Sequence, residues 1–223
     1  IHTLRQKKAA GEKITMLTAY DFSMAKIVDS AGIDIILVGD SASNVMAGHE
    51  TTLPITLDQM IYHASSVVRA VERALVVVDL PFGYYQGNSR LALESAIRVM
   101  KEAGAHAIKM EGGSELAPTI HYLTQRGIPV MAHVGLMPQH VNSYGGFKAQ
   151  GKHDAPSRAI MQSARDVAKA GAFAVVLEGI MEPLARAISE LADARKDDLV
   201  GARGRAANLA HALKTPLAAL SAQ

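Results

Sequence analysis

Hydrophobic runs that end in an ionisable side chain recur along the chain and constrain its fold most strongly. The run at residues 33–38 is almost continuously aliphatic and stops at Gly39 and Asp40. Such a run is typical of a strand buried on both faces of a parallel sheet. The same event recurs at residues 74–79, 105–111, 130–133 and 174–178, which end in Asp79, Glu111, His133 and Glu178. Repeated strands with reactive ends predict a parallel α/β barrel with those ends gathered at one rim.

Helical segments alternate with these strands. Residues 14–19 supply a further first strand, and helices are expected at residues 3–10, 22–31, 57–72, 89–103, 115–126, 157–170 and 183–191. Glycines just past the helix ends stop four of them, at residues 32, 104, 127 and 171. The alternation predicts six consecutive β/α units.

The C-terminal residues do not continue this alternation. Residues 191–223 are rich in Ala, Arg and Leu and lack a β-branched run, so we expect a divergent helical tail there. Either barrel residues are missing after about residue 190 or the tail replaces them. The sequence therefore predicts an α/β fold, a (β/α)8 TIM-type barrel whose last two strands are not recognisable in this chain, with the barrel domain at residues 1–190.

Composition excludes several classes of function. A length of 223 residues suits one α/β domain, and a net charge of +2 without a basic block argues against nucleic-acid binding. The absence of cysteine excludes disulfides and thiolate metal sites. No hydrophobic run has the length of a membrane span, and the first residues lack the apolar segment of a signal peptide. We therefore expect a cytoplasmic protein that binds neither nucleic acid nor membrane.

Three carboxylates stand at consecutive strand ends, on Asp40, Asp79 and Glu111. The ends of parallel barrel strands lie side by side, so these side chains are expected to converge. Carboxylates packed together repel one another, and a divalent cation relieves that repulsion. Oxygen ligands without cysteine favour a hard ion, with Mg²⁺ as the first choice. The alternative is that each acid pairs with a basic residue or caps a helix.

Two neighbouring residues are candidates for binding an anionic substrate. Lys109 lies two residues before Glu111, so both side chains point to the same face of the strand. Its ammonium group would bind a substrate carboxylate, or form a salt bridge to Glu111, and the two roles are compatible. Ser41 would bind an anionic oxygen or cap the turn of its own loop.

Glu178 is the candidate general base. It ends an apolar strand, and partial desolvation raises the pKa of a carboxylate into the range that suits proton abstraction. The alternative is an acid satisfied by backbone donors. His133 is either a hydrogen-bonded core histidine or a site residue, and His49, in the long loop at residues 41–54, is expected to be structural or loop-closing.

A metal, a carboxylate-binding lysine and a base together suit one type of reaction. Bidentate coordination of a 2-oxo acid stabilises the enolate that forms when a neighbouring C–H bond loses its proton. The enolate then attacks an electrophilic carbon, or the reverse reaction breaks a C–C bond.

Six sequence segments resemble the ketopantoate hydroxymethyltransferase family. They are residues 18–21 (TAYD), 38–41 (VGDS), 48–54 (GHETTLP), 79–82 (DLPF), 109–113 (KMEGG) and 133–136 (HVGL). Their order and spacing match the family across residues 3–190. The resemblance implies a barrel of the phosphoenolpyruvate mutase and isocitrate lyase kind. It also implies hydroxymethyl transfer from 5,10-methylenetetrahydrofolate to 3-methyl-2-oxobutanoate, giving 2-dehydropantoate (ketopantoate) in pantothenate biosynthesis.

The resemblance also implies roles for individual residues. The positions that match the Mg²⁺ site of the family are Asp40, Asp79 and Glu111. The positions that match its oxo-acid contacts are Asp40, Ser41, Asp79 and Lys109, and we add His133 as a further substrate-binding candidate. Glu178 matches the proton acceptor. Bacterial family members are commonly decamers of two pentamer rings, so we expect a homodecamer.

Two departures from the family leave alternatives open. Residues 42–44 read Ala-Ser-Asn where many members have Leu-Gly-Met, and the family's later Gly-rich strand and the strand after it are absent. One alternative is a C–C lyase of the same superfamily acting on a 2-oxo or 2-hydroxy dicarboxylate, although those lyases usually carry a cysteine in a mobile loop. The other is a catalytically inactive barrel, against which the retention of the acidic residues and Lys109 argues.

Overall fold

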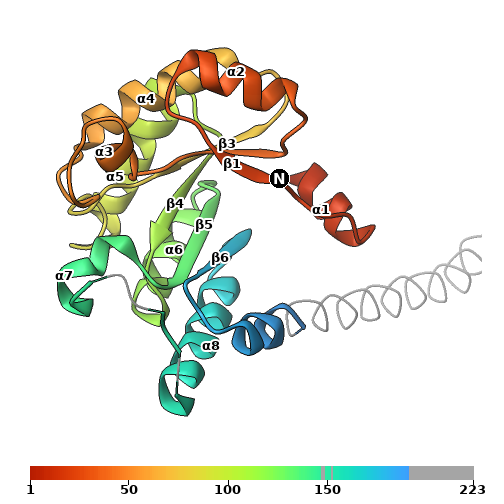
Figure 1. Cartoon of the computed structure of the whole chain (residues 1–223), viewed down its shortest axis with the longest axis vertical. Coiled ribbons are helices and arrows are strands. Elements are labelled where there is room, and N and C mark those ends of the chain that lie inside the picture. Colours follow the sequence, from red (N-terminus) through yellow and green to blue (C-terminus); the bar gives the residue numbers. More distant parts are fainter. Residues whose placement is uncertain (147–148, 152, 191–223) are drawn as a thin grey trace, which may run out of the picture. The chain divides into compact units, whose positions relative to one another are not determined.

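The computed structural model describes residues 1–146, 149–151 and 153–190 (Figure 1). Residues Ile1–Ile180 form one compact unit, and a second unit begins at Met181. The tail predicted at residues 191–223 lies outside the described residues. The domain boundary expected at residue 190 stays a prediction.

The first unit is built on a six-stranded parallel sheet. Its strands are β1 (Met16–Thr18), β2 (Ile35–Val38), β3 (Leu75–Asp79), β4 (Ala107–Glu111), β5 (Val130–Gly135) and β6 (Ala174–Glu178). They pair in chain order from β1 to β6, which is the strand order of a barrel. Within the described residues β1 and β6 are the edges of the sheet. The predicted parallel α/β architecture and its six recognisable strands are therefore confirmed.

Helices connect successive strands. The α-helices are α1 (His2–Ala9), α2 (Phe22–Ser30), α3 (Ala42–Val45), α4 (Leu57–Ala70), α5 (Ser89–Arg98), α6 (Ala117–Thr124), α7 (Val141–Tyr144) and α8 (Asp154–Lys169). A π-helical turn, η1 (Val99–Ala103), continues α5, and 3₁₀ turns form η2 (Ser114–Leu116) and η3 (Pro138–His140). In the second unit, residues 182–190 are helical. The long loop expected at residues 41–54 contains α3, which its sequence did not indicate.

The start of α4 illustrates how local sequence fixes a helix. Thr56 accepts the N–H of Gln59 on its hydroxyl, and the Gln59 side chain accepts the N–H of Thr56 in return. This capping box satisfies two backbone donors that the first helical turn leaves without partners. Of the two caps expected from the sequence, Thr56 and Asp58, the structure therefore uses Thr56.

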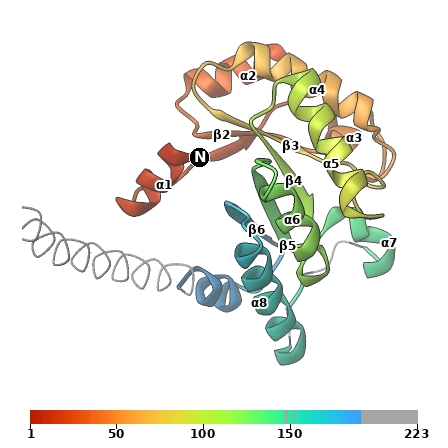
Figure 2. The ribbon, with the colours of Figure 1, turned by 180° about the vertical axis from the view of Figure 1, so that it is seen from behind.

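Both faces of the four central strands, β2 to β5, are buried, as their near-continuous aliphatic runs predicted, whereas β1 is exposed. One face contributes Ile36, Val38, Val76, Val78 and Ile108 to the main core. Helices α2, α4, α6 and α8 cover this face in both views (Figures 1 and 2). The opposite face forms a second cluster of Ile35, Leu37, Val77, Ala107 and Met131, against which Leu4 of α1 packs.

Helix α1 is fixed by a buried acid that interrupts the second hydrophobic run. Asp34 forms an ion pair with Lys7 at 2.6 Å and accepts the backbone N–H and the hydroxyl of Thr15. This explains the single charged residue in the otherwise aliphatic run before Asp40. None of the helices that the structure describes has an apolar stretch long enough to cross a bilayer.

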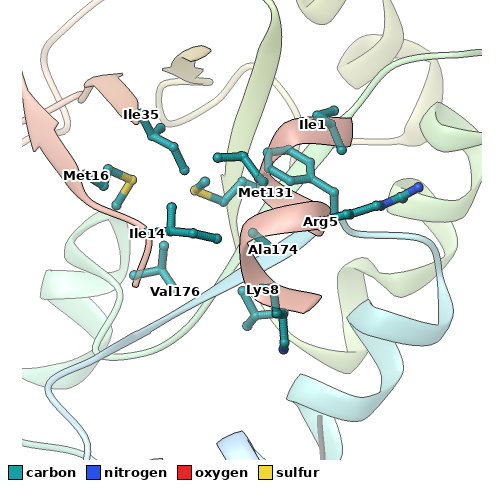
Figure 3. A pocket seen from close by; sticks show the side chains of 12 residues that line it. Ile1, Arg5, Lys8, Ile14, Met16, Ile35, Met131, Ala174 and Val176 are labelled. Carbon is teal, nitrogen blue, oxygen red and sulfur yellow. The ribbon is translucent and has the colours of Figure 1, made fainter. Parts of the chain in front are cut away.

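A pocket of about 350 Å³ lies against the face of the sheet that carries Ile35 and Met131 (Figure 3). Its lining is mostly apolar and comes from α1 and from strands that include Met16, Ile35, Met131 and Val176. None of the residues predicted to carry the chemistry at the strand ends lines this pocket.

Candidate functional site

The three predicted metal carboxylates meet at the carboxyl ends of neighbouring strands. Asp79 and Glu111 are the last residues of β3 and β4, and Asp40 follows β2. All three are at most 3% exposed. The backbone N–H of Asp40 donates to Asp79 Oδ2 at 3.2 Å. We call these three residues the acidic cluster.

Lys109 is the buried counter-charge of the acidic cluster. It lies directly opposite Asp79 in the register of β3 and β4. Its Nζ is 2.6 Å from Asp79 Oδ1 and 3.9 Å from Glu111 Oε1. Burial by itself lowers the pKa of Lys109, but the surrounding carboxylates outweigh it and the pKa is raised. Lys109 is therefore a charged ammonium in the interior.

The acidic cluster carries more negative charge than Lys109 neutralises. When all four groups are ionised, three negative charges face one positive charge. Burial, followed by repulsion from Asp79 and Glu111, raises the pKa of Asp40 to about 7. Asp40 Oδ2 accepts a hydrogen bond from Gln139 Nε2 at 2.9 Å, whereas Oδ1 accepts none from the residues that the structure describes. Asp40 is therefore the member of the cluster that most readily takes up a proton when no cation is bound.

Glu111 is stabilised in its ionised form. Burial acts to raise its pKa, but contacts with His133 and Lys109 and the N–H of Gln139 together lower it. The N–H of Gln139 donates to Glu111 Oε2 at 2.9 Å. Glu111 and Asp40 therefore differ in proton affinity although both are buried.

His133 lies between two carboxylates. Its Nδ1 is 3.4 Å from Glu111 Oε1 and its Nε2 is 3.4 Å from Glu178 Oε2. These distances exceed those of a good hydrogen bond, and neither ring nitrogen has a hydrogen-bond partner although the residue is only 1% exposed. A buried imidazole with both nitrogens unsatisfied is unusual, and a ligand group is one way to satisfy it.

Glu178 ends β6 and is the most accessible of the predicted site residues. Its side chain is 47% exposed, so the carboxylate is only partly desolvated. Its contact with His133 nevertheless connects it to Glu111. The strand ends therefore bring the predicted base to the same rim as the acidic cluster.

Ser41 does not cap its own turn, which was one of its two expected roles. It begins α3 without a side-chain capping bond, and its Oγ lies 2.8 Å from the hydroxyl of Tyr20. A Cβ added to Gly39 would lie 2.9 Å from Ser41 Oγ and 3.5 Å from Asp79 Oδ2. The absence of a side chain at Gly39 therefore leaves space between Ser41 and the acidic cluster.

His49 is placed away from these groups. It is exposed, and its backbone closes the loop by donating to Ser43 O and accepting from Asn44 Nδ2. This agrees with the loop-closing role expected for it.

Three residues that the sequence did not single out also touch the site. Gln139 and Tyr85 are buried and hydrogen-bonded to Asp40 or Glu111, and Tyr20 contacts Ser41. The available signal for Gln139 was a polar residue that follows Pro138 in the loop after the fifth strand. Nothing in the local pattern indicated Tyr85.

The donor set of the acidic cluster fits a hard divalent cation. It consists of oxygen atoms only, and its excess charge is of the sign that a cation neutralises. In the described part of the chain, no three His, Asp or Glu side chains are arranged so that they could hold a metal ion together. Mg²⁺ keeps several water ligands and needs only one or two protein carboxylates, so an incomplete set is compatible with it.

Comparison with known proteins gives relatives over most of the chain. The sequence profile of the family described as ketopantoate hydroxymethyltransferase matches residues 1–194. The chain is 59% identical over 188 residues to a 3-methyl-2-oxobutanoate hydroxymethyltransferase of Cytophaga hutchinsonii, covering 84% of this chain and 69% of that protein. It is 61% identical over 191 residues to the enzyme of that name from Porphyromonas gingivalis, covering 85% and 70%.

Solved structures share the fold at low sequence identity. A 2,3-dimethylmalate lyase of the PEP mutase/isocitrate lyase superfamily has a TM-score of 0.61 and 19% identity, with 85% of this chain and 67% of that chain covered. A phosphonopyruvate hydrolase in complex with oxalate and Mg²⁺ has a TM-score of 0.61 and 16% identity, and this chain covers 62% of its length. The fold class predicted from the sequence is therefore confirmed.

Proposed function

The chain belongs to the ketopantoate hydroxymethyltransferase family, and on that premise we propose that the acidic cluster binds 3-methyl-2-oxobutanoate together with a divalent cation. The family and the enzyme class predicted from the sequence are confirmed by these relatives. The roles of individual residues are the proposal. The observation that carries it is the convergence of Asp40, Asp79 and Glu111 around one buried lysine.

The proposed cation is Mg²⁺, held by Asp40, Asp79 and Glu111 either directly or through its water ligands. The support for it is the oxygen-only donor set and the raised pKa of Asp40, which reflects its burial first and then repulsion from Asp79 and Glu111. When bound, the ion supplies Lewis-acid polarisation of the 2-oxo group, which makes the adjacent C–H bond more acidic.

Lys109 is proposed to bind the carboxylate of the oxo acid. An ammonium group has three donors, and Asp79 Oδ1 occupies one of them at 2.6 Å. The remaining donors are available to a substrate anion in an interior where charge-assisted hydrogen bonds are strong. Ser41, positioned by Tyr20, is proposed to donate to the same substrate.

Glu178 is proposed as the base that removes the proton from C3 of the oxo acid. The C–H bond breaks, its electron pair delocalises onto the 2-oxo group, and the proton moves to a Glu178 carboxylate oxygen. The new C–C bond then forms between C3 and the one-carbon unit of 5,10-methylenetetrahydrofolate as one of its two C–N bonds breaks. The second C–N bond breaks when water supplies the hydroxyl group, and tetrahydrofolate leaves with the proton taken from C3 and the remaining proton of water on its nitrogens. His133, 3.4 Å from both Glu178 and Glu111, is proposed to contact the substrate through a ring nitrogen that now lacks a partner.

Isotope exchange tests this assignment without folate. The chain is incubated with 3-methyl-2-oxobutanoate in D₂O, and the C3 proton is followed by NMR with Mg²⁺ and with EDTA. We expect exchange that requires Mg²⁺ and that falls about 100- to 10,000-fold in Glu178→Gln. Absence of exchange with retained substrate binding would favour an inactive barrel, and cleavage of a dicarboxylate would favour a lyase.

Three finer expectations belong to the same proposal. Membership of the family implies that 5,10-methylenetetrahydrofolate is the cosubstrate. We also propose a homodecamer of two pentamer rings and a cytoplasmic location. Size-exclusion chromatography with light scattering tests the number of subunits. Formation of ketopantoate that requires added 5,10-methylenetetrahydrofolate tests the cosubstrate.

A further inference from the structure

Gln139 contacts two members of the acidic cluster that come from strands not adjacent to each other. It lies in the 3₁₀ turn η3 after β5 and is 3% exposed. Its backbone N–H donates to Glu111 Oε2 at 2.9 Å. Its side-chain Nε2 donates to Asp40 Oδ2 at 2.9 Å and to the carbonyl of Leu80 at 3.0 Å. One residue therefore connects the ends of β2 and β4.

The orientation of the Gln139 amide is determined by its partners. The carbonyl of Leu80 can only accept a hydrogen bond, so the NH₂ group must face it, and Asp40 Oδ2 is the second partner of the same nitrogen. The amide oxygen lies 2.7 Å from the hydroxyl of Tyr85 and 2.9 Å from Gln86 Nε2, both of which can donate. A flipped amide would place oxygen against two acceptors and NH₂ against two donors. The side chain is thus a fixed donor to Asp40.

The hydroxyl of Tyr85 stabilises this arrangement by hydrogen bonds to Gln139 and to the backbone of Glu111. It is fully buried, and its hydroxyl accepts the N–H of Glu111 at 3.1 Å. The same hydroxyl lies 3.0 Å from the carbonyl of Glu111 and 2.7 Å from Gln139 Oε1, so its single proton serves these two acceptors. Because the network is buried and satisfied, rotation of the Gln139 side chain would break several hydrogen bonds together.

We propose that Gln139 is a positioning residue for the cation site: it holds Asp40 and Glu111 at a fixed separation and engages Asp40 Oδ2, leaving Oδ1 for a further ligand. This inference rests on the proposed function, because it assumes that the acidic cluster binds a divalent cation. Hydrogen-bond partners of metal-binding carboxylates fix the direction of the ligand oxygens, and their loss typically weakens metal affinity about 10- to 100-fold. Gln139 does not itself contact the substrate in this proposal.

The first test measures Mn²⁺ binding to the full chain by electron paramagnetic resonance, without substrate or folate. We expect Gln139→Leu to weaken Mn²⁺ affinity about 10- to 100-fold. The matched control is Gln86→Ala, which removes a side-chain amide bonded to the same Gln139 oxygen but to no carboxylate of the cluster. Its Mn²⁺ affinity should stay within about 2-fold of the parent chain.

A second readout separates positioning from a merely structural role. For Gln139→Leu, the Mg²⁺ concentration that half-saturates C3 exchange should rise about 10-fold or more, while the rate at saturating Mg²⁺ stays close to that of the parent chain. Circular dichroism confirms that each variant is folded. A folded Gln139→Leu with unchanged Mn²⁺ affinity overturns the proposal, as does a parent chain that binds no Mn²⁺. Parent-chain Mn²⁺ binding that depends on Gln139, without C3 exchange, supports the positioning role while refuting the proposed function.

Discussion

Lys109 Nζ and Asp79 Oδ1 lie 2.6 Å apart across the paired strands β3 and β4, and both side chains are less than a tenth exposed. Because each charge has lost its water, the pair is stable only as long as both partners remain. The same contact holds an ammonium group beside the proposed substrate position. The stability of the fold and the proposed binding of the substrate therefore depend on the same ion pair.

Removal of the ammonium group should destabilise the metal-free protein. Lys109→Met leaves Asp79, Asp40 and Glu111 without a counter-charge, so we expect the free energy of unfolding to fall by about 3–5 kcal/mol. The measurement is urea denaturation at pH 7.5 in EDTA. In the double variant Lys109→Met/Asp79→Asn part of this loss should be recovered, because one of the repelling charges is gone. A loss below about 1 kcal/mol in the single variant would contradict the buried pair.

The pH dependence of stability should carry the signature of Asp40. Its pKa is about 7 in the folded chain, whereas an unfolded Asp titrates near its ordinary value of 3.8. Between these values the folded state holds a proton that the unfolded state has lost. The stability of the metal-free protein should therefore fall as pH rises from about 4 to about 7.

The Asp40→Asn variant isolates this contribution from other titrating groups. His106, for example, has a pKa lowered mainly by burial, and it acts in the opposite direction over part of this range. The difference between the parent chain and Asp40→Asn, measured by urea denaturation at several pH values in EDTA, should therefore shrink toward acidic pH. Added Mg²⁺ should stabilise the parent chain most above pH 7. A pH-independent difference would exclude a raised pKa at Asp40.

Adding a side chain at Gly39 should weaken substrate binding more than it lowers the stability of the fold. Gly39→Ala places a Cβ 2.9 Å from Ser41 Oγ, which forces that hydroxyl to move away from Tyr20. We expect KM for the oxo acid to rise about 10-fold, the equivalent of roughly 1.4 kcal/mol, with little change in urea midpoint. Gly87→Ala is the matched control, since its Cβ meets only Leu91 Cδ2 at an ordinary 3.4 Å. Equal KM values for the two variants would refute the role of this space.

His133 should be dispensable for folding although it is buried. Neither ring nitrogen has a hydrogen-bond partner, so His133→Leu removes unsatisfied polar atoms, but it also removes a contact that stabilises the ionised Glu111. We expect the two effects to offset one another, so the free energy of unfolding should change by less than about 1 kcal/mol. The exchange rate at C3 should nevertheless fall, because a proposed ligand contact is lost.

His106 provides the contrasting control for this prediction. Its Nδ1 accepts the backbone N–H of Val76 at 2.9 Å, so His106→Leu leaves that donor unsatisfied and should cost about 1–3 kcal/mol. Urea denaturation of both variants checks the order of the two effects. A His133→Leu variant as destabilised as His106→Leu would indicate that His133 is an ordinary core histidine.

The fold was largely predictable because its determinants are local. Each strand of the sheet is marked by its own aliphatic run, and the Thr56–Gln59 capping box lies within four consecutive residues at the start of α4. The boundaries were less predictable, because the π-helical turn at the end of α5 and the 3₁₀ turn before α6 depend on packing. Residues 191–223 lie outside the part of the chain that the structure describes, so the predicted tail remains a prediction.

By itself the sequence determined that Asp40, Asp79 and Glu111 stand at strand ends, and parallel pairing in chain order then obliges such ends to share a rim. Only the tertiary structure decided which partner each group has. It paired Lys109 with Asp79 at 2.6 Å, left both nitrogens of His133 unsatisfied, and bonded Gln139 to Asp40 across 99 positions of sequence. The reason is that hydrophobic periodicity is set by near neighbours, whereas a hydrogen bond in the interior depends on distance and angle between groups that only the packed chain brings together.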